Sequence, residues 1–227
     1  MSLNCQGSNH ARTCIPNQDY VSGGIDSTGR YKVIVLADGV SSCRYSGEGA
    51  RIACIKTKQF LLDNAQKIFG YKNEVISEYV VGIVCLELSS YAERNGGIIA
   101  DYSSTLSAVL YDSIEGKAVI FHLGDGLILL VNNCDCRVVG VPSNNYQGTP
   151  VTTTEDVFKL PLVSRIDVQD NKYILICSDG AWEHMYSEGL LKSEISNYIT
   201  SGNFAKLDNY IINKKPEDDY SYVVMDL

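Results

Sequence analysis

The segment YKVIVLADG, residues 31–39, indicates how the centre of this chain folds. After Lys32 it carries only apolar, mostly β-branched residues before the Asp-Gly pair, which predicts a buried strand over 31–37. The segment YILICSDG, residues 173–180, repeats the arrangement, with a strand expected over 172–177. Each strand therefore brings a rigidly held carboxylate, Asp38 or Asp179, to its end.

An Asp-Gly pair also forms type I′ hairpin turns, which require a second strand directly afterwards. The first pair is followed by VSSCRYSGEGAR and a helical pattern, and the second by the helix-like AWEHMY. The hairpin interpretation therefore fails at both places. Around Asp125, in Gly-Asp-Gly at 124–126, the strand-like LILLV resumes at once, so a hairpin turn and a metal-ligand role both remain open.

Helical and strand-like patterns alternate along the rest of the chain. We expect helices over 46–69, 73–95, 188–199 and 203–213, and strands over 104–111, 117–123, 127–132, 136–141, 157–160 and 220–226. The four strands after residue 104 predict an antiparallel meander, and the polar segment 142–156 predicts a loop or flap. This order predicts an α+β fold, in which two antiparallel sheets stack between outer layers of helices.

The composition excludes several classes of protein. Hydrophobic residues make up 45% of the 227 positions and the net charge is −8, so we expect an ordered chain without nucleic-acid or anionic-membrane partners. No apolar stretch reaches the roughly 18 residues of a membrane span, and the N-terminus lacks a signal-peptide pattern. We therefore expect a cytoplasmic protein, one domain over 1–227, with its eight cysteines reduced.

Two further acidic positions stand next to strands. Asp19 closes NQD at 17–19 before a β-like segment, and Asp218 lies in EDD at 217–219 before the final strand. Taken alone, the first is also compatible with an ordinary polar loop and the second with a solvated acidic turn. If the carboxylates at strand ends converge in one cleft, they suit hard cations such as Mg²⁺ or Mn²⁺.

Seven segments, taken in order, resemble the metal-dependent protein serine/threonine phosphatases of the type 2C family, in particular its small bacterial members. They are NQD at 17–19, VLADGV at 35–40, GEGARIA at 47–53, SSTLSAVLY at 103–111, HLGDG at 122–126, ILICSDGAW at 174–182 and DDYSYVVM at 218–225. Each segment is weakly specific alone, but together they span nearly the whole chain in the family's order. The resemblance implies a four-layer sandwich of two antiparallel β-sheets flanked by pairs of helices.

The resemblance also implies a centre of two divalent cations, Mn²⁺ or Mg²⁺, with a third, weaker site. Carried over by position, the ligands of the two cations would be Asp38 as the bridge, the Gly39 carbonyl, Asp179 and Asp218. Asp19 matches the acidic residue that orients metal-bound water, and Asp125 matches a ligand of the third cation. Two such cations can deprotonate a water that bridges them and stabilise an in-line displacement at phosphorus.

The implied activity is hydrolysis of phosphoserine and phosphothreonine in proteins by that bridging water, without a phosphoenzyme. No Cys-x5-Arg loop surrounds any of the cysteines, in keeping with this route. The expected partners are a phosphorylated protein and a cognate Ser/Thr kinase, and we expect a monomer. The alternative is a catalytically weak phosphoprotein-binding module on the same fold, against which the retained Asp38, Asp179 and Asp218 argue.

The sequence departs from the family pattern near the expected phosphate site. VSS at 40–42 stands where the family often has His or Met followed by Gly-Gly, so a candidate general acid is missing. Arg12 precedes Asp19 by seven residues, farther than usual, and His10 competes with it. We expect Arg12 to contact the phosphate and give His10 a smaller claim as the acid, and for both a surface-loop role remains open. Asp219 replaces the usual Asn and would add a charge beside the metals.

Overall fold

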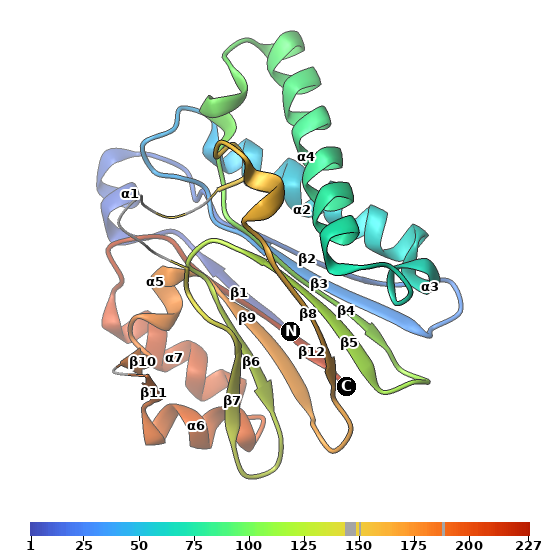
Figure 1. Ribbon diagram of the computed structural model, residues 1–227. Helices are drawn as coiled ribbons and strands as arrows, with labels where there is room; N and C mark the ends of the chain where they lie inside the picture. The colour runs from blue at the N-terminus through green and yellow to red at the C-terminus, as the bar shows by residue number, and fades with distance from the viewer. Residues whose placement is uncertain (144–148, 150, 188) are drawn as a thin grey trace.

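The computed structural model contains two five-stranded antiparallel sheets that stack face to face (Figure 1). It describes residues 1–143, 149, 151–187 and 189–227. One sheet has the strand order β1-β12-β9-β6-β7 and the other β2-β3-β4-β5-β8. The strands of the first sheet are β1 (Ser2–Cys5), β6 (Leu127–Val131), β7 (Cys136–Gly140), β9 (Tyr173–Cys177) and β12 (Tyr220–Asp226). Those of the second are β2 (Tyr20–Ile25), β3 (Tyr31–Ala37), β4 (Leu106–Asp112), β5 (Lys117–Leu123) and β8 (Leu162–Asp167).

Helices cover the outer face of each sheet (Figure 1). The second sheet is covered by α2 (Ser46–Asp63) and α4 (Asn73–Asn95), and the first by α6 (Ser193–Thr200) and α7 (Phe204–Lys214). The shorter elements are α1 (Ser8–Thr13), α3 (Ala65–Ile68), η1 (Ile99–Tyr102), η2 (Val157–Lys159), α5 (Asp179–Trp182) and the two-residue strands β10 (Tyr186–Ser187) and β11 (Leu190–Leu191). The α+β fold of two antiparallel sheets with outer helices, expected from the sequence, is confirmed.

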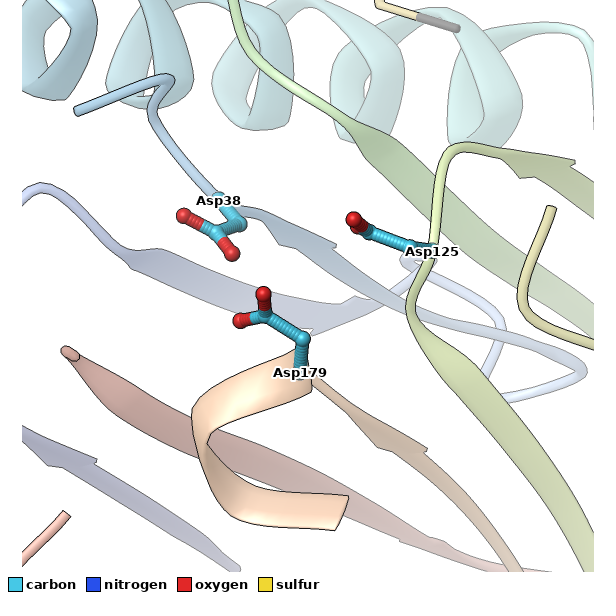
Figure 2. A group of neighbouring side chains, drawn as sticks. All are labelled: Asp38, Asp125 and Asp179. Carbon is cyan, nitrogen blue, oxygen red and sulfur yellow. The ribbon is translucent and has the colours of Figure 1, made fainter. Parts of the chain in front are cut away.

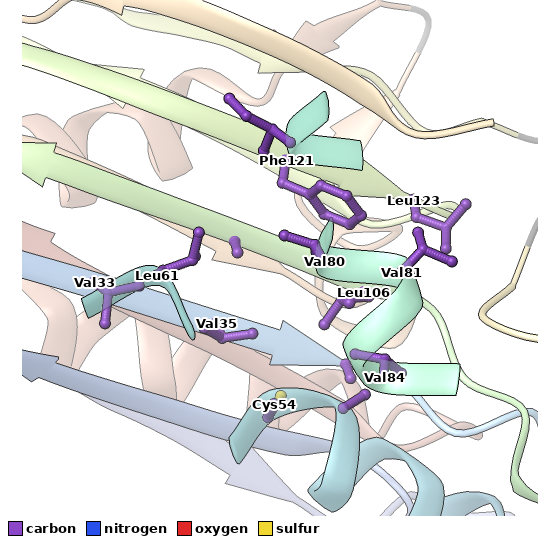
Figure 3. Packing of buried hydrophobic residues seen from close by; sticks show 14 of the residues in the cluster. Val33, Val35, Cys54, Leu61, Val80, Val81, Val84, Leu106, Phe121 and Leu123 are labelled. Carbon is purple, nitrogen blue, oxygen red and sulfur yellow. The ribbon is translucent and has the colours of Figure 1, made fainter. Parts of the chain in front are cut away.

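The core lies in three layers, and strand β3 shows why its sequence is continuously apolar. Val33 and Val35 point toward α2 and α4, whereas Ile34 and Leu36 point into the space between the two sheets. Figure 3 shows the outer layer, where side chains of β3, β4 and β5 meet those of both helices. Because each face of β3 is buried, alternation between apolar and polar residues disappears, and both faces contribute to stability.

The meander predicted after residue 104 is wrong at its centre. Strand β5 pairs with β4 and β8, whereas β6 pairs with β7 and β9, so the chain changes sheets between β5 and β6. Gly124 has a φ of +116°, and a Cβ there would lie 2.6 Å from the side chain of Thr105, so only glycine fits this crossover. The hairpin alternative for Asp125 is therefore wrong, because the strands on its two sides are not paired.

Other differences concern short elements. The strand expected over 157–160 is the 3-10 helix η2, and the edge strand β8 directly after it was not expected. The helix expected over 46–69 is interrupted at Asn64. In the segment 188–199 the helix begins only at Ser193, and residue 188 lies outside the described residues. The expected loop over 142–156 also lies partly outside them.

Helix α4 is long and apolar enough to cross a membrane by length and composition, with a mean hydropathy of 1.4. In this fold 39% of its most apolar window is buried. Its residues Val80, Val84 and Leu88 pack against the sheet and α2. The face of α4 that carries these residues is therefore part of the core of the sandwich.

Candidate metal centre

Three aspartates from separate parts of the chain meet at one end of the sandwich. Asp38 follows β3, Asp179 begins α5 just after β9, and Asp125 lies in the crossover between β5 and β6. Figure 2 shows that their side chains point toward one another, and one oxygen of each lies within 4.8 Å of the others. The two sheets therefore bring together carboxylates that are up to 141 positions apart in the sequence (179 − 38).

The backbone of Asp38 is held by Thr105, the residue directly before strand β4. The Asp38 N–H donates to Oγ1 of Thr105 at 3.0 Å, and the Asp38 carbonyl accepts from the Thr105 N–H at 2.8 Å. Gly39 lies so close to its neighbours that a Cβ would stand 2.8 Å from the Ser46 carbonyl carbon and 2.9 Å from the Gln18 oxygen. Glycine at this position therefore permits the close approach that places the Asp-Gly pair.

Asp179 and Asp218 lie next to two paired strands: Asp179 comes shortly after β9, and Asp218 shortly before β12. The Asp179 carboxylate accepts a hydrogen bond of 2.6 Å from the Gly180 N–H. A Cβ at Gly180 would lie 2.2 Å from the Asp219 carbonyl oxygen, so glycine is required where α5 touches the start of β12. Asp218 is exposed and lines the same pocket as Asp38, Asp125 and Asp179.

Asp19 lies behind this group and is only 4% exposed. Its Oδ2 accepts a hydrogen bond of 2.9 Å from the hydroxyl of Ser178, whereas its Oδ1 has no partner among the described residues. Burial raises the pKa of Asp19 to about 7, although the hydrogen bond from Ser178 works against the shift. An unsatisfied buried carboxylate oxygen of this kind calls for a further donor.

The carboxylates disturb one another electrostatically. Burial, followed by repulsion from Asp19 and Asp179, raises the pKa of Asp38 well above its usual range. Burial also raises the pKa of Asp179 to about 6, and Asp125 and Asp218 add to the effect. These shifts show that the site is costly to ionise without a positive ligand.

Four of these aspartates line one pocket, which has a volume of about 410 Å³: Asp38, Asp125, Asp179 and Asp218. Among the described residues that line it there is no Lys, Arg or His, so nothing in its wall neutralises the carboxylates. We call it the carboxylate pocket. The ligand atoms that cluster here are carboxylate oxygens, and Cys43, which also lines the pocket, is not part of the cluster. Uncompensated carboxylates of this kind fit hard divalent cations better than soft, thiolate-seeking ones.

Asp125 is held on both sides. Its main-chain carbonyl accepts a hydrogen bond of 2.8 Å from the indole Nε1 of Trp182, and its Oδ2 accepts one of 2.9 Å from Oγ1 of Thr149. Trp182 thus supports the site without contributing a carboxylate to it. Thr149 also lines the carboxylate pocket, and no sequence pattern had pointed to it.

His10 does not reach the carboxylate pocket in this structure but forms a buried pair with Asp219. His10 is 7% exposed, and its Nδ1 lies 2.8 Å from Oδ2 of Asp219. The same carboxylate accepts hydrogen bonds from the N–H groups of Gly7 at 2.7 Å and Gln18 at 2.6 Å. The extra charge of Asp219 is therefore directed toward the N-terminal segment, where three donors satisfy it, and not toward the metal ligands.

Arg12 lies on the exposed side of α1, where its guanidinium donates to the side chain of Asn9. It is not among the described residues that line the carboxylate pocket. His122 is buried between Ser107 and the Val141 carbonyl, and burial lowers its pKa to about 4, in keeping with a structural role. Of the residues singled out near the N-terminus, only Asp19 reaches the acidic group directly.

The fold and the site together define a class: a two-sheet sandwich with helical outer layers and a carboxylate centre able to hold divalent cations. The family model described as protein phosphatase 2C matches residues 6–209, and the chain belongs to this family. The family resemblance and the enzyme class expected from the sequence, a protein serine/threonine phosphatase, are thereby confirmed. A sequence comparison with curated proteins finds no match.

Three solved structures illustrate the similarity of the fold. The serine/threonine phosphatase Stp1 from Staphylococcus aureus is 13% identical with a TM-score of 0.73, over 100% of this chain and 94% of that one. The catalytic domain of PstP, crystallised with two manganese ions, is 15% identical with a TM-score of 0.71, over 100% and 96%. RsbX, in complex with magnesium, is 12% identical with a TM-score of 0.62, over 100% and 93%.

Proposed function

We propose that this protein hydrolyses phosphoserine and phosphothreonine in phosphorylated proteins, using two divalent cations in the carboxylate pocket. The observation that carries the proposal is the convergence of Asp38, Asp125 and Asp179, whose oxygens lie within 4.8 Å of one another. Manganese and magnesium in the complexes of PstP and RsbX support the choice of Mn²⁺ or Mg²⁺.

In this proposal Asp38, the Gly39 carbonyl, Asp179 and Asp218 hold the two cations, and Asp125 contributes to a third, weaker site. When bound, the cations would lower the pKa of the water between them and neutralise charge that develops on the phosphate. The carboxylates hold the cations at fixed positions, because their backbones are anchored to paired strands. The deprotonated water and the phosphate both carry negative charge. Positive charge in the carboxylate pocket is therefore needed to bring them together.

Asp19 is proposed to orient the attacking water. Ser178 fixes one oxygen of its carboxylate, and the other oxygen, Oδ1, remains free to accept a hydrogen bond. A single open acceptor at a fixed position can align a water for in-line attack. This role requires no movement of the strand ends.

The serine oxygen that leaves must take up a proton, and we assign its delivery to His10. The Asp219 carboxylate fixes the imidazole through Nδ1. His10 lines a cavity that shares Ser41 and Asp218 with the carboxylate pocket, so a leaving group at the border of the two spaces is near the imidazole. A histidine oriented by a buried carboxylate is suited to proton transfer. Arg12 would have to leave Asn9 before it could contact a phosphate. A cognate kinase, a monomeric state and a cytoplasmic location stay predictions from the sequence.

The test is turnover of p-nitrophenyl phosphate and of a phosphoserine peptide, with Mn²⁺ and with excess EDTA, by the wild type and by Asp38→Asn. We expect activity only with the cation, and a loss of several orders of magnitude in the variant. Asp63→Asn, an exposed change at the end of α2, serves as the control, and circular dichroism verifies that each variant is folded. Undiminished turnover in EDTA would contradict the proposal.

A further inference from the structure

Ser178 lies where strand β9 ends and helix α5 begins, and it is completely buried. Its N–H donates a hydrogen bond of 2.9 Å to the main-chain carbonyl of Ser221 on β12, which continues the pairing of the two strands by one residue. Asp179 follows Ser178 directly, and Asp218 comes three residues before Ser221. Ser178 therefore belongs to the backbone that places two aspartates of the carboxylate pocket.

The return bond between these two residues is made by the hydroxyl of Ser178 and not by its carbonyl. Two residues opposite each other in an antiparallel ladder can exchange both N–H···O bonds through their main chains. The Ser178 carbonyl instead accepts hydrogen bonds from the N–H groups of Ala181 and Trp182, at 3.2 and 3.0 Å, as α5 begins. The Ser221 N–H therefore donates to Oγ of Ser178, at 2.9 Å. An alanine at this position would leave a buried N–H without its acceptor.

The proton of the Ser178 hydroxyl has two acceptors within reach. Oδ2 of Asp19 lies at 2.9 Å and the Ser221 carbonyl oxygen at 3.3 Å. The Ser221 carbonyl already accepts from the Ser178 N–H, and a carboxylate is the stronger acceptor. The hydroxyl therefore accepts from β12 and donates to Asp19, and each of these two bonds fixes the geometry of the other.

The bond between Ser178 and Asp19 connects the two sheets. Asp19 directly precedes β2 of the second sheet, whereas Ser178 follows β9 of the first. The other oxygen of Asp19, Oδ1, is buried without a hydrogen-bond partner among the described residues. The orientation of the Asp19 carboxylate therefore depends on the bond at Oδ2, and through that bond on the pairing of β9 with β12.

We propose that Ser178 is a positioning residue for the hydrolysis: its hydroxyl holds the Asp19 carboxylate in the orientation that leaves Oδ1 for the attacking water. This inference rests on the proposed function, since it deepens the role given there to Asp19. Ser178 is not among the described residues that line the carboxylate pocket, so it acts through Asp19 and not on the substrate. Its loss should lower kcat, because a misaligned water reacts more slowly, and should change KM and the Mn²⁺ requirement little.

A double-mutant cycle of Ser178→Ala and Asp19→Ala tests this role. Turnover of p-nitrophenyl phosphate at a series of Mn²⁺ concentrations gives kcat, KM and the concentration for half-maximal activity. We expect Ser178→Ala to lower kcat about tenfold in the wild-type background and less than about twofold in the Asp19→Ala background. In the single variant, KM and the Mn²⁺ requirement should stay within about twofold of the wild type. An equal loss of kcat in the two backgrounds would overturn the inference, because Ser178 would then act independently of Asp19.

Ser178→Ala also removes the acceptor of the Ser221 N–H, so a second pair of variants isolates the donated proton. Ser178→Thr and Ser178→Val introduce side chains of nearly the same size, of which only threonine has a hydroxyl. We expect kcat of the Thr variant to exceed that of the Val variant several-fold. Ser77→Ala is the matched control, because it removes a buried hydroxyl that donates 2.7 Å to the Phe158 carbonyl, and it should leave kcat unchanged.

Unfolding of the same cycle in urea and EDTA gives a readout that needs no activity. If Ser178 holds Asp19, the effects of the two substitutions on the unfolding equilibrium constant should depart from additivity by about fivefold, as for one buried hydrogen bond. Additive effects, or equal kcat values for the Thr and Val variants, would overturn the inference and leave the phosphatase activity established. If the wild type hydrolyses nothing in Mn²⁺, the proposed function fails, and non-additive unfolding still supports Ser178 as the residue that holds Asp19. Additive unfolding in an inactive protein overturns both.

Discussion

The indole Nε1 of Trp182 donates a hydrogen bond of 2.8 Å to the main-chain carbonyl of Asp125. Trp182 ends the same short helix that Asp179 begins, so this bond connects two of the clustered aspartates through the backbone. The crossover between the sheets and the start of α5 are thereby held at a fixed separation. The geometry of the carboxylate pocket depends in part on a residue that is not itself a ligand.

Trp182→Phe should therefore weaken cation binding more than it weakens the fold. Loss of one hydrogen bond to a main-chain carbonyl costs about 1 kcal/mol of stability. We expect the Mn²⁺ concentration for half-maximal activity to rise several-fold, with little change in activity at saturating Mn²⁺. Tyr186→Phe is the control, because Tyr186 contacts the Trp182 ring edge to face and no such hydrogen bond joins it to Asp125 among the described residues. An unchanged Mn²⁺ requirement in Trp182→Phe would show that the bond does not position Asp125.

The raised pKa values of the acidic group predict how stability depends on pH without cations. The folded-state pKa values of Asp19, about 7, and Asp179, about 6, lie above those of the unfolded chain, near 3.8. Between about pH 4 and 7 the folded state thus binds more protons, so its free energy of unfolding falls as pH rises. In EDTA we expect a melting temperature a few degrees lower at pH 8 than at pH 5.

Cations should reverse this trend, since they bind the ionised carboxylates. Addition of Mn²⁺ should raise the melting temperature more at pH 8 than at pH 5, because fewer protons have to be displaced. Asp179→Asn should reduce both the slope in EDTA and the shift with Mn²⁺. A melting temperature in EDTA that rises from pH 5 to pH 8 would contradict the assignment of these groups.

Asp219 should be a structural residue. Its carboxylate accepts hydrogen bonds from Gly7 and Gln18 and pairs with His10, so Asp219→Ala leaves three buried groups without a partner. We expect a loss of about 3 kcal/mol in the free energy of unfolding, measured by urea denaturation. Asp219→Asn keeps one acceptor oxygen and should cost less. Equal losses in the two variants would mean that the cost comes from packing and not from the hydrogen bonds.

Much of the fold and of the site follows from local sequence patterns. The apolar runs of β3 and β9 and their Asp-Gly ends are visible in any short window, and the structure brings Asp38 and Asp179 together. Local patterns could not predict that the chain changes sheets between β5 and β6. The segment LILLV after Gly-Asp-Gly has the same pattern in a hairpin and in a crossover between sheets. Strand pairing is decided by partners distant in the sequence.

The edge strand β8 and the contacts of Asp219 escaped prediction for related reasons. In β8 most side chains are exposed or half-buried, so no continuous apolar run identifies it. The donors to Asp219 come from residues 7–18, about 200 positions earlier, and no spacing rule connects them. The sequence therefore indicated the ligand types at the strand ends, whereas the supporting contacts required the three-dimensional structure.

The last prediction separates His10 from Arg12 in the proposed reaction. Nitrophenolate leaves readily without a proton, whereas a serine oxygen requires one, so loss of a general acid should affect a phosphopeptide far more than p-nitrophenyl phosphate. We expect His10→Asn to lower kcat for the phosphopeptide by about 100-fold and kcat for p-nitrophenyl phosphate by much less. Arg12→Ala should resemble Arg137→Ala, an exposed control on β7, because its guanidinium is bound to Asn9 at the surface. If Arg12→Ala instead lowers turnover of both substrates, Arg12 leaves Asn9 to bind the phosphate, and the sequence-based expectation for Arg12 is the better one. An equal loss on both substrates in His10→Asn would assign His10 to phosphate binding, since only a general acid distinguishes the two leaving groups.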